Sequence, residues 1–348
     1  MLSPHGVTTD EADAMRRALV LAATPGIRPG VNPRVGCVLL RPDGGVVAEG
    51  THRGAGTPHA EVEALERAGG AARGATAVVT LEPCDHTGRT GPCTQALLAA
   101  GIARVVFAQT DPHAVAAGGA ATLRAAGVDV EGGLLADQAE ALNLEWAAAV
   151  TLGRPHVTWK YAASLDGRSA AADGSSRWVS GPESRHEVHE RRRAADAVVV
   201  GTGTVTADDP RLTVRVDGEV LPYIQQPVRV VVGRRPVPAG ARVLDDSAPT
   251  FHLTTHDVDE VLTCLWDTGI RRVLLEGGPT LAGAFWRADR VDRVVGYVAP
   301  ALLGAGAPAL VGTGITTIAD AVRLELVDVA RVGADIRLVA VPTARRSP

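Results

Sequence analysis

Four side chains on three separate segments most constrain how this chain can fold: His59, Glu61, Cys84 and Cys93. The sequence pattern places His59 and Cys93 at the starts of two helices and Cys84 in a loop after a strand. One imidazole and two thiolates form a soft ligand set that suits zinc, and two thiolates balance the charge of Zn²⁺. The three segments must therefore meet at one point if this set is to hold a metal.

A zinc ion with three protein ligands keeps one coordination position for water. The metal lowers the pKa of that water to about 7, which makes hydroxide available near neutrality. Glu61 follows His59 closely enough to take a proton from this water and deliver it to a leaving group. We therefore expect Glu61 to be the catalytic proton carrier and not a ligand. Zinc deaminases have this arrangement, with a His-x-Glu motif followed by Pro-Cys-x-x-Cys.

Two other interpretations of these residues stay open. In the first, His59 and the two cysteines are unrelated residues at helix starts and in the core. For any one of these residues taken by itself, this would be the better explanation. The site can also be a closed structural zinc site, because His86 could supply a fourth ligand. The spacing of Cys84 and Cys93 is also wider than the two intervening residues of the general deaminase pattern.

The length of 348 residues favours two domains, since one hydrophobic core usually stops growing at roughly 250–300 residues. Helical and strand-like segments alternate up to residue 146, which is typical of an α/β domain. A new β pattern begins soon afterwards, so we place the domains at residues 1–147 and 148–348. The predicted helices cover residues 10–22, 58–67, 92–100, 182–193 and 258–268. The predicted strands cover residues 35–40, 46–50, 77–81, 104–109, 157–161, 197–200, 228–232, 272–275 and 294–298, with a closing antiparallel pair near Leu324 and Ile336.

Composition limits the classes of partner. The formal net charge is -4 without a basic block, so binding to nucleic acid has little support, and a small-molecule substrate is expected. No stretch is long and apolar enough to cross a bilayer, and the first residues lack a signal-peptide pattern. The four cysteines are too few and too scattered for a disulfide framework. We expect a cytoplasmic protein without a membrane partner, and a homo-oligomer is compatible with the sequence.

Glycine-rich turns in the second domain indicate an anion site. Gly201 and Gly203 follow a strand but lack the third glycine of a Rossmann fingerprint. The stronger candidate is the turn at Gly277 and Gly278, which runs from a strand into Pro279 at a first helical position. Such a turn exposes backbone N–H groups to a phosphate, although an ordinary strand-to-helix connection would look the same.

Longer motifs resemble the bifunctional riboflavin-biosynthesis deaminase/reductase family. In the first domain they are Asn-Pro-Arg-Val-Gly-Cys-Val at residues 32–38, His-Ala-Glu at 59–61 and Glu-Pro-Cys-Asp-His-Thr-Gly-Arg-Thr-Gly-Pro-Cys at 82–93. In the second they are Lys-Tyr-Ala-Ala-Ser-Leu-Asp-Gly at 160–167, the stretch 204–215 and the stretch 276–283. The family's motifs occur in its order over nearly the whole chain.

The resemblance implies an α/β fold, with a cytidine-deaminase-like three-layer domain followed by a dihydrofolate-reductase-like domain. It implies Zn²⁺ and NADPH as cofactors and a pyrimidine ribose phosphate as substrate. The implied zinc ligands are His59, Cys84 and Cys93, with Glu61 as proton shuttle. The implied NADPH contacts are Ala162, Trp178, Thr204, Asp208, Gly233, Gly278, Pro279, Thr280, Leu281, Ala282, Gly283 and Ala284. The implied substrate contacts are Asn32, His52 and His86 in the first domain and Ser176, Arg192, Leu212, Arg215 and Glu276 in the second.

Residue chemistry supports part of this assignment. The guanidinium groups of Arg192 and Arg215 suit a phosphomonoester, because each presents paired donors to phosphate oxygens. Lys160 is the only lysine in the chain, and we add it as a candidate donor near the ribose oxygen. The sequence departs from the family at residues 111–114, where Asp-Pro-His-Ala replaces the usual Asp-Pro-Asn-Pro. That difference affects expected contacts with the ribose phosphate and not the chemistry at zinc.

Two other functions remain to be distinguished from the bifunctional enzyme. A zinc-dependent nucleic-acid base deaminase would share the first site, but the large second domain and the lack of a basic block argue against it. A non-catalytic, zinc-stabilised nucleotide sensor would bind the same ligands without turnover. Release of ammonia from a free pyrimidine nucleotide and oxidation of NADPH separate the three.

Overall fold

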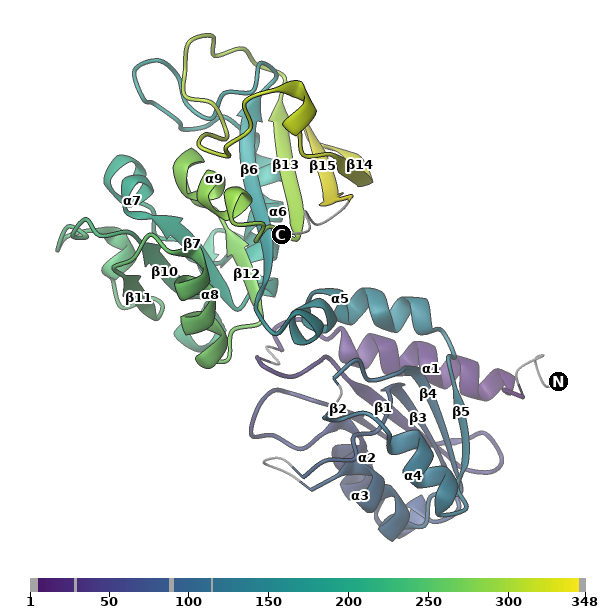
Figure 1. The fold of residues 1–348 in the computed structure, drawn as a ribbon. Coiled ribbons are helices and arrows are strands. Elements are labelled where there is room, and N and C mark those ends of the chain that lie inside the picture. Colours follow the sequence, from purple (N-terminus) through teal and green to yellow (C-terminus); the bar gives the residue numbers. More distant parts are fainter. Residues whose placement is uncertain (1–5, 28–29, 88–90, 114, 344–348) are drawn as a thin grey trace. The chain divides into compact units, whose positions relative to one another are not determined.

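The computed structural model describes residues 6–27, 30–87, 91–113 and 115–343 (Figure 1). Residues 88–90 of the motif between the two cysteines, and Ala114 of the departing loop, lie outside the described residues. The chain divides into two units, Met1–Gly153 and Arg154–Pro348. Helix α5 (Ala136–Leu152) continues to the end of the first unit. The sequence-based boundary between residues 147 and 148 falls inside this helix.

The N-terminal unit is built on a five-stranded sheet in the order β2-β1-β3-β4-β5. Its strands are β1 (Gly36–Leu40), β2 (Val46–Thr51), β3 (Thr76–Leu81), β4 (Arg104–Gln109) and β5 (Asp129–Gly132). Strand β1 is antiparallel to β2 and β3, whereas β3, β4 and β5 are parallel. The carboxyl ends of β3 and β4 therefore lie at the same edge of the sheet.

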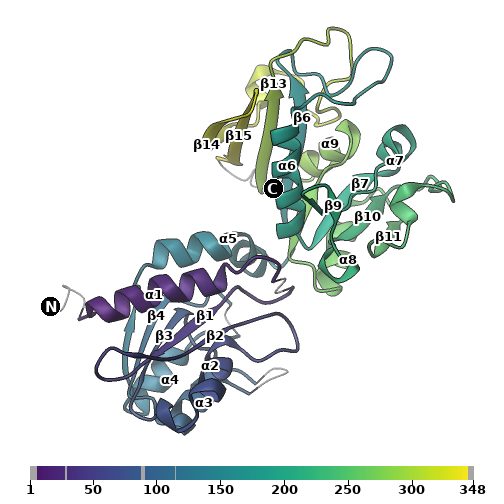
Figure 2. The same cartoon turned by 180° about the vertical axis from the view of Figure 1, so that it is seen from behind.

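Helices cover both faces of this sheet, which gives the expected three layers. The other four helices are α1 (Thr9–Ala22), α2 (Ala60–Ala68), α3 (Cys93–Ala100) and α4 (Gly119–Ala125). Figures 1 and 2 show α1 and α5 on one face and α2, α3 and α4 on the other. Side chains alternate along the central strands, so Val78 packs in the core beneath α1 and Val79 packs in the core beneath α2 and α3. Thr8 and Glu11 form a capping box that fixes the start of α1.

The C-terminal unit has an eight-stranded sheet in the order β11-β10-β7-β12-β6-β13-β15-β14. Its strands are β6 (His156–Ser164), β7 (Ala197–Gly201), β10 (Val228–Val232), β11 (Thr250–Leu253), β12 (Arg272–Leu275), β13 (Arg293–Ala299), β14 (Leu324–Val332) and β15 (Asp335–Pro342). The six strands from β11 to β13 are parallel, and β15 and β14 close the sheet as an antiparallel pair. This confirms the predicted pair near Leu324 and Ile336. A separate short hairpin joins β8 (Arg215–Val216) to β9 (Glu219–Val220).

Four helices pack against the larger sheet: α6 (Pro182–Ala194), α7 (Thr202–Asp208), α8 (Val258–Asp267) and α9 (Pro279–Arg287). Helices α8 and α9 contribute Leu265 and Phe285 to a core on one face, while α6 contributes Val188 to a core on the other. Figures 1 and 2 show these opposite positions. Within the described residues, no helix has both the length and the apolar character needed to cross a membrane.

Candidate functional sites

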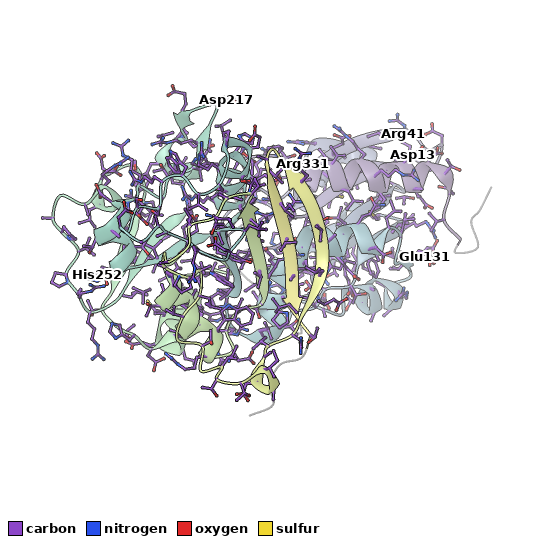
Figure 3. The ribbon with its side chains drawn as sticks, turned by 90° about the horizontal axis from the view of Figure 1, so that it is seen from above. Asp13, Arg41, Glu131, Asp217, His252 and Arg331 are labelled. Atoms are coloured by element: carbon purple, nitrogen blue, oxygen red, sulfur yellow. The ribbon has the colours of Figure 1, made fainter. Side chains whose placement is uncertain are left out.

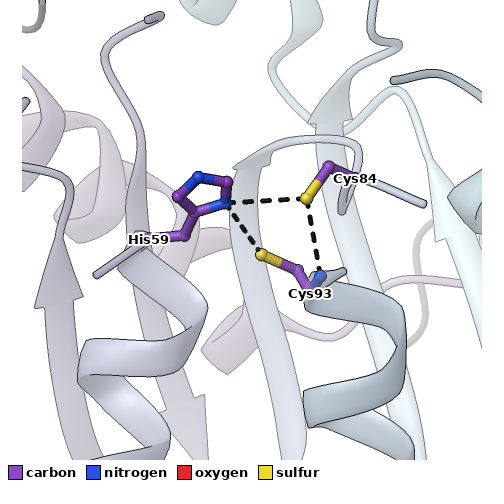
Figure 4. Close-up of side chains that lie close together, drawn as sticks. All are labelled: His59, Cys84 and Cys93. Carbon is purple, nitrogen blue, oxygen red and sulfur yellow. Dashed lines mark hydrogen bonds between the residues drawn. The ribbon is translucent and has the colours of Figure 1, made fainter. Parts of the chain in front are cut away.

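The first site lies where three segments of the N-terminal unit converge (Figure 4). His59 is the residue that precedes α2, Cys93 is the first residue of α3, and Cys84 lies in the loop after β3. The Nδ1 atom of His59 lies 3.1 Å from Sγ of Cys93 and 3.5 Å from Sγ of Cys84. The backbone N–H of Cys93 donates to Sγ of Cys84 at 3.4 Å. The fold thus brings together the three residues expected to be ligands.

The chemistry of these donors fits zinc. One ring nitrogen and two sulfurs lie within 4.8 Å of one another, which is close enough for one ion to touch all three. Hydrogen bonds from the Cys93 thiol and from His59 lower the pKa of Cys84, which favours the thiolate that a metal needs. Among the described histidines, cysteines and carboxylates, His86 does not join this group and no fourth side chain does. The cluster therefore has the composition of an open, three-ligand site.

Glu61 is placed next to these ligands by the first turn of α2 and is 4% exposed. Burial raises the pKa of its carboxyl group, and the neighbouring His59 partly opposes this rise. A carboxyl group with a raised pKa exchanges protons more readily near neutral pH than an exposed glutamate does. Its environment suits a proton carrier.

Two of the expected pyrimidine contacts are bonded to each other beside the ligands. Nε2 of His52 lies 2.8 Å from Nδ2 of Asn32, and Nδ1 lies 3.0 Å from the carbonyl oxygen of Pro58. A carbonyl only accepts, so the ring proton is on Nδ1, and Nε2 accepts from the Asn32 amide. Burial lowers the pKa of His52, which keeps this neutral form. The His52 ring also packs edge-on against His59, with centroids 5.2 Å apart.

His86, the third expected pyrimidine contact, lies two residues after Cys84. Its Nδ1 is buried and has no hydrogen-bond partner among the described residues. A buried ring nitrogen left in this state is available to a ligand.

Two acidic residues that sequence reasoning missed hold the loop that carries Cys84. Glu82 is buried and accepts hydrogen bonds from the N–H groups of Ala120 and Asp111, at 3.0 and 3.3 Å. Asp85 accepts from the hydroxyls of Thr94 and Thr122, both at 2.6 Å. The only sequence signal for this role is that both residues flank Pro83-Cys84.

The second site is centred on a buried ion cluster at the carboxyl end of β12, beside the middle of β6. Nε and Nη2 of Arg192 donate to the two carboxylate oxygens of Glu276 at 2.6 and 3.0 Å. Nζ of Lys160 lies 3.7 Å from the same carboxylate. Burial opposes ionisation of Glu276, but Arg192 and Lys160 outweigh it and lower its pKa to about 2. The structure therefore brings together Arg192 and Glu276, two of the expected substrate contacts. Lys160, which we added as a candidate because it is the only lysine, lies beside them.

The other expected substrate residues lie on two neighbouring loops. Oγ of Ser176 donates to Oδ1 of Asp208 at 2.8 Å, which joins an expected substrate contact to an expected cofactor contact. The side chain of Leu212 is buried in a hydrophobic core, and its backbone is in the left-handed region with φ 56°. Arg215 begins the β8–β9 hairpin.

The expected cofactor residues gather where parallel strands end, the usual ligand edge of such a sheet. The N–H of Gly278 donates to Oγ1 of Thr204 at 2.9 Å, linking the start of α9 to α7. Gly233 follows β10 with φ 134°, and its carbonyl lies 2.9 Å from Nε2 of His252, which Figure 3 labels. Pro279 is at the first position of α9, as predicted. Ala162 lies near the end of β6.

Not all of the segment expected to bind NADPH faces the same way. Ala282 is fully buried in the core beneath α9. A Cβ atom at Gly283 would lie 1.6 Å from the carbonyl oxygen of Val311, so this glycine permits close chain packing. Leu281 and Ala284 are half-buried against the same core, and Thr280 is exposed. The N–H of Gly278 already donates to Thr204 and Pro279 has no N–H, so a phosphate at this turn would be met by the N–H groups of Thr280 and Leu281 in the first turn of α9.

Trp178 lies on the surface of the C-terminal unit. It is 69% exposed, and the guanidinium of Arg185 stacks 4.6 Å from its ring centroid. The structure does not bring it into contact with the Arg192–Glu276 pair.

Comparisons with known proteins identify the family of each unit. The family model for the cytidine and deoxycytidylate deaminase zinc-binding region matches residues 8–109, and the RibD C-terminal domain matches residues 155–338. The riboflavin biosynthesis protein RibD of Mycobacterium tuberculosis is 52% identical over 308 residues, which cover 88% of this chain and 90% of that protein.

Solved structures give the same result over the full length. RibD of Acinetobacter baumannii is similar with a TM-score of 0.86 and 38% identity, covering 96% of this chain and 99% of that one. A diaminohydroxyphosphoribosylaminopyrimidine deaminase/5-amino-6-(5-phosphoribosylamino)uracil reductase of Thermotoga maritima has a TM-score of 0.85 and 34% identity, with the same coverage. The expected fold class, a cytidine-deaminase-like domain followed by a dihydrofolate-reductase-like domain, is confirmed. The chain therefore belongs to the RibD family of riboflavin biosynthesis enzymes, which join a zinc-dependent deaminase to an NADPH-dependent reductase.

Proposed function

We propose that this chain catalyses two consecutive reactions of riboflavin biosynthesis. The first is hydrolytic deamination of 2,5-diamino-6-(5-phosphoribosylamino)pyrimidin-4-one. The second is reduction of the ribosyl group of 5-amino-6-(5-phosphoribosylamino)uracil to ribityl. The observation that carries the proposal is the convergence of His59, Cys84 and Cys93 beside the buried Glu61, in a chain whose second unit has its own ion-lined site. We assign deamination to the N-terminal domain and reduction to the C-terminal domain.

In the deaminase domain, His59, Cys84 and Cys93 would hold the metal. When bound there, Zn²⁺ supplies Lewis-acid activation of a water molecule. Glu61 takes the proton from that water and gives it to the departing 2-amino group, which leaves as ammonia. Asn32 and His52, which are bonded to each other, would orient the pyrimidine. Nδ1 of His86, which has no partner among the described residues, would contact it as well.

In the reductase domain, NADPH supplies a hydride when bound. The bond between C1 of the ribose and its ring oxygen breaks, a C–H bond forms at C1, and the ring oxygen takes a proton. Lys160 is the proposed donor of this proton, since burial lowers its pKa and makes the ammonium a better acid. We assign the remaining substrate contacts to Ser176, Leu212 and Glu276. The proposed contacts to the cofactor are Ala162, Trp178, Thr204, Asp208, Gly233 and residues 278–284.

The substrate's phosphate is assigned to Arg215 and to the remaining donors of Arg192. Glu276 and the carbonyl of Thr213 occupy three of the five N–H groups of the Arg192 guanidinium. Within the described part of the chain, two of its N–H groups remain for a ligand. Glu276 also cancels part of the positive charge of Arg192, so Arg215 is the stronger candidate for the phosphate dianion.

The decisive experiment incubates the full chain with the diaminopyrimidinone ribose phosphate and follows ammonia and NADPH together. We expect ammonia with or without NADPH, and oxidation of NADPH only after deamination. Ammonia from RNA but not from this nucleotide would support a nucleic-acid deaminase instead. Stoichiometric binding without either product would support a nucleotide sensor.

We further propose that the enzyme works in the cytoplasm on small molecules. Its four cysteines form no disulfide, and two of them are needed as thiolates, which a reducing compartment preserves.

A further inference from the structure

Three consecutive residues of the reductase unit have their backbone groups bound by the side chains of other residues. Nη1 of Arg192 donates to the carbonyl of Thr213 at 3.0 Å. The N–H of Arg215 donates to Nδ1 of His189 at 3.2 Å. Between them, both backbone groups of Val214 are bound by one side chain, that of Gln226.

Gln226 makes three hydrogen bonds with its amide group. Its Oε1 accepts from the N–H of Val214 at 2.7 Å, and its Nε2 donates to the carbonyls of Val214 and Leu221, at 3.2 and 2.7 Å. The residue is 4% exposed, so water cannot replace these contacts. The amide thus pairs with Val214 as a neighbouring strand would.

The backbone here needs such partners. Residues 211–214 have no regular secondary structure, and Leu212 adopts a left-handed backbone with φ 56°, so the segment cannot join the large sheet as a strand. Thr213 and Val214 are nevertheless buried, at 2% and 0% exposure. Buried backbone groups without partners are costly. The carbonyl of Val214 also accepts from the backbone N–H of Leu221 at 3.1 Å, whereas the N–H of Val214 is bound by the Gln226 side chain.

We infer that Gln226, supported by His189, is a positioning residue of the reductase: it fixes residues 213–215 so that Arg215 presents its guanidinium to the substrate's phosphate. This rests on the proposed function, in which Arg215 binds that phosphate. Neither the sequence motifs nor the resemblance to the family pointed to Gln226. It acts through Arg215 and is not expected to touch the substrate.

The state of His189 agrees with this role. To accept from the Arg215 N–H, the ring must be neutral with its proton on Nε2. Burial lowers the pKa of His189 to about 4, helped by the positive charge of Arg192 and, less, by that of Arg215. Glu276 and a hydrogen bond with the backbone of Thr213 oppose this fall. The acceptor is therefore in place at neutral pH.

The test compares Gln226→Met with Gln225→Met in the full chain. Methionine keeps the length of the side chain and removes all three hydrogen bonds, while Gln225 makes no side-chain hydrogen bond among the described residues and is the matched control. Steady-state reduction is measured with the phosphorylated substrate and with the same compound lacking the 5-phosphate. Ammonia release by the deaminase domain is measured as an internal control.

For Gln226→Met we expect KM for the phosphorylated substrate to rise about tenfold or more, with a much smaller change in kcat, because binding to the phosphate is lost in both ground and transition states. The variant should equal wild type on the compound without phosphate. Gln225→Met and deamination should be unchanged. An equal loss on both substrates, or no loss on either, overturns the inference. A wild-type enzyme that treats both substrates alike overturns the assignment of phosphate to Arg215 instead, so the two failures are distinguishable.

Binding of NADPH shows whether the reductase domain of Gln226→Met has folded. If it no longer binds NADPH, the pair His189→Leu and His189→Asn replaces it. Asparagine restores an acceptor near the position of Nδ1 and leucine does not, so only leucine should raise KM for the phosphorylated substrate. The same KM in both variants overturns the inference.

Discussion

The guanidinium of Arg192 and the carboxylate of Glu276 form two parallel hydrogen bonds, 2.6 and 3.0 Å long, although 84 residues separate them in the chain. Side-chain exposures of 15% and 7% place the pair mostly out of water. Lys160 adds a second cation to the same carboxylate. One negative charge thus compensates two buried positive charges, which makes Glu276 the residue on which the electrostatics of the reductase site depend.

Replacement of Glu276 by Gln should damage both stability and reduction. The neutral amide leaves Arg192 and Lys160 without a counter-charge, and removing one partner of a buried pair typically costs about 3–5 kcal/mol. We expect the free energy of unfolding to fall by an amount at the lower end of that range. The variant should also lose NADPH oxidation, while its ammonia release stays unchanged. The control is Glu219→Gln in β9, an exposed carboxylate without an ion pair among the described residues. An unfolding curve equal to that of wild type would contradict the prediction.

The ionisation of Glu276 should also make the free energy of unfolding depend on pH. The pKa of Glu276 is lowered to about 2 from an ordinary 4.5, so the folded state binds its proton less readily than the unfolded state. This contribution, about 3 kcal/mol, is fully present above 4.5 and is lost as the pH falls toward 2. Four of the five tryptophans lie in the second unit, so their fluorescence during denaturant titration reports mainly on it. The fall in stability between pH 4.5 and 2 should be shallower in Glu276→Gln than in wild type, and equal slopes would exclude Glu276 as its cause.

The sequence predicted most of the parallel strands of the reductase domain, because buried parallel strands are continuous runs of apolar β-branched residues. Two of them, Val228–Val232 and Arg272–Leu275, have the predicted bounds. The prediction missed β11, whose sequence Thr-Phe-His-Leu is not such a run. Helix α7 was missed, since its sequence Thr-Gly-Thr-Val-Thr-Ala-Asp is rich in β-branched residues and favours a strand by propensity. Packing of Val205 against the sheet outweighs that local preference.

The zinc site could be predicted because its ligands lie in short motifs whose spacing is characteristic. The ion cluster of the reductase could not be assembled in this way. Lys160, Arg192 and Glu276 come from a strand, a helix and a strand end, and only the order of strands in the sheet brings them together. Gln226 and Asp85 act through hydrogen bonds to distant segments, for which a single sequence has no periodic signal.

Glu61→Gln should abolish deamination while zinc remains bound. The amide keeps the size of the side chain but cannot carry the proton, and loss of a general acid–base group typically costs about 10²–10⁴ in rate. Zinc content, ammonia release and reduction of the deaminated substrate are measured on one preparation, with Glu66→Gln on the exposed side of α2 as control. Near-wild-type ammonia release would remove Glu61 from the mechanism.

Asp85→Ala should weaken zinc binding without touching a ligand. The carboxylate ties the Cys84 loop to α3 through Thr94 and to α4 through Thr122. Loss of such outer contacts usually lowers metal affinity about 10–100-fold. Competition with a chelator measures this affinity, and Asp137→Ala in α5, an exposed aspartate, is the control. If affinity is unchanged, the two threonine contacts do not position Cys84.

Thr204→Val should impair NADPH binding selectively. Its hydroxyl accepts the N–H of Gly278 at 2.9 Å and so holds the turn that precedes α9. Valine keeps the shape and removes the acceptor, which leaves the turn free to move away from the position proposed for the cofactor's phosphate. Since one hydrogen bond contributes about 1 kcal/mol, we expect KM for NADPH to rise about fivefold, with deamination unaffected. Thr206→Val is the matched control, because among the described residues the hydroxyl of Thr206 bonds only to the carbonyl of Thr202 within α7. An equal effect of both substitutions would mean that the valine disturbs the helix α7 itself, and that Thr204 has no particular role at the cofactor turn.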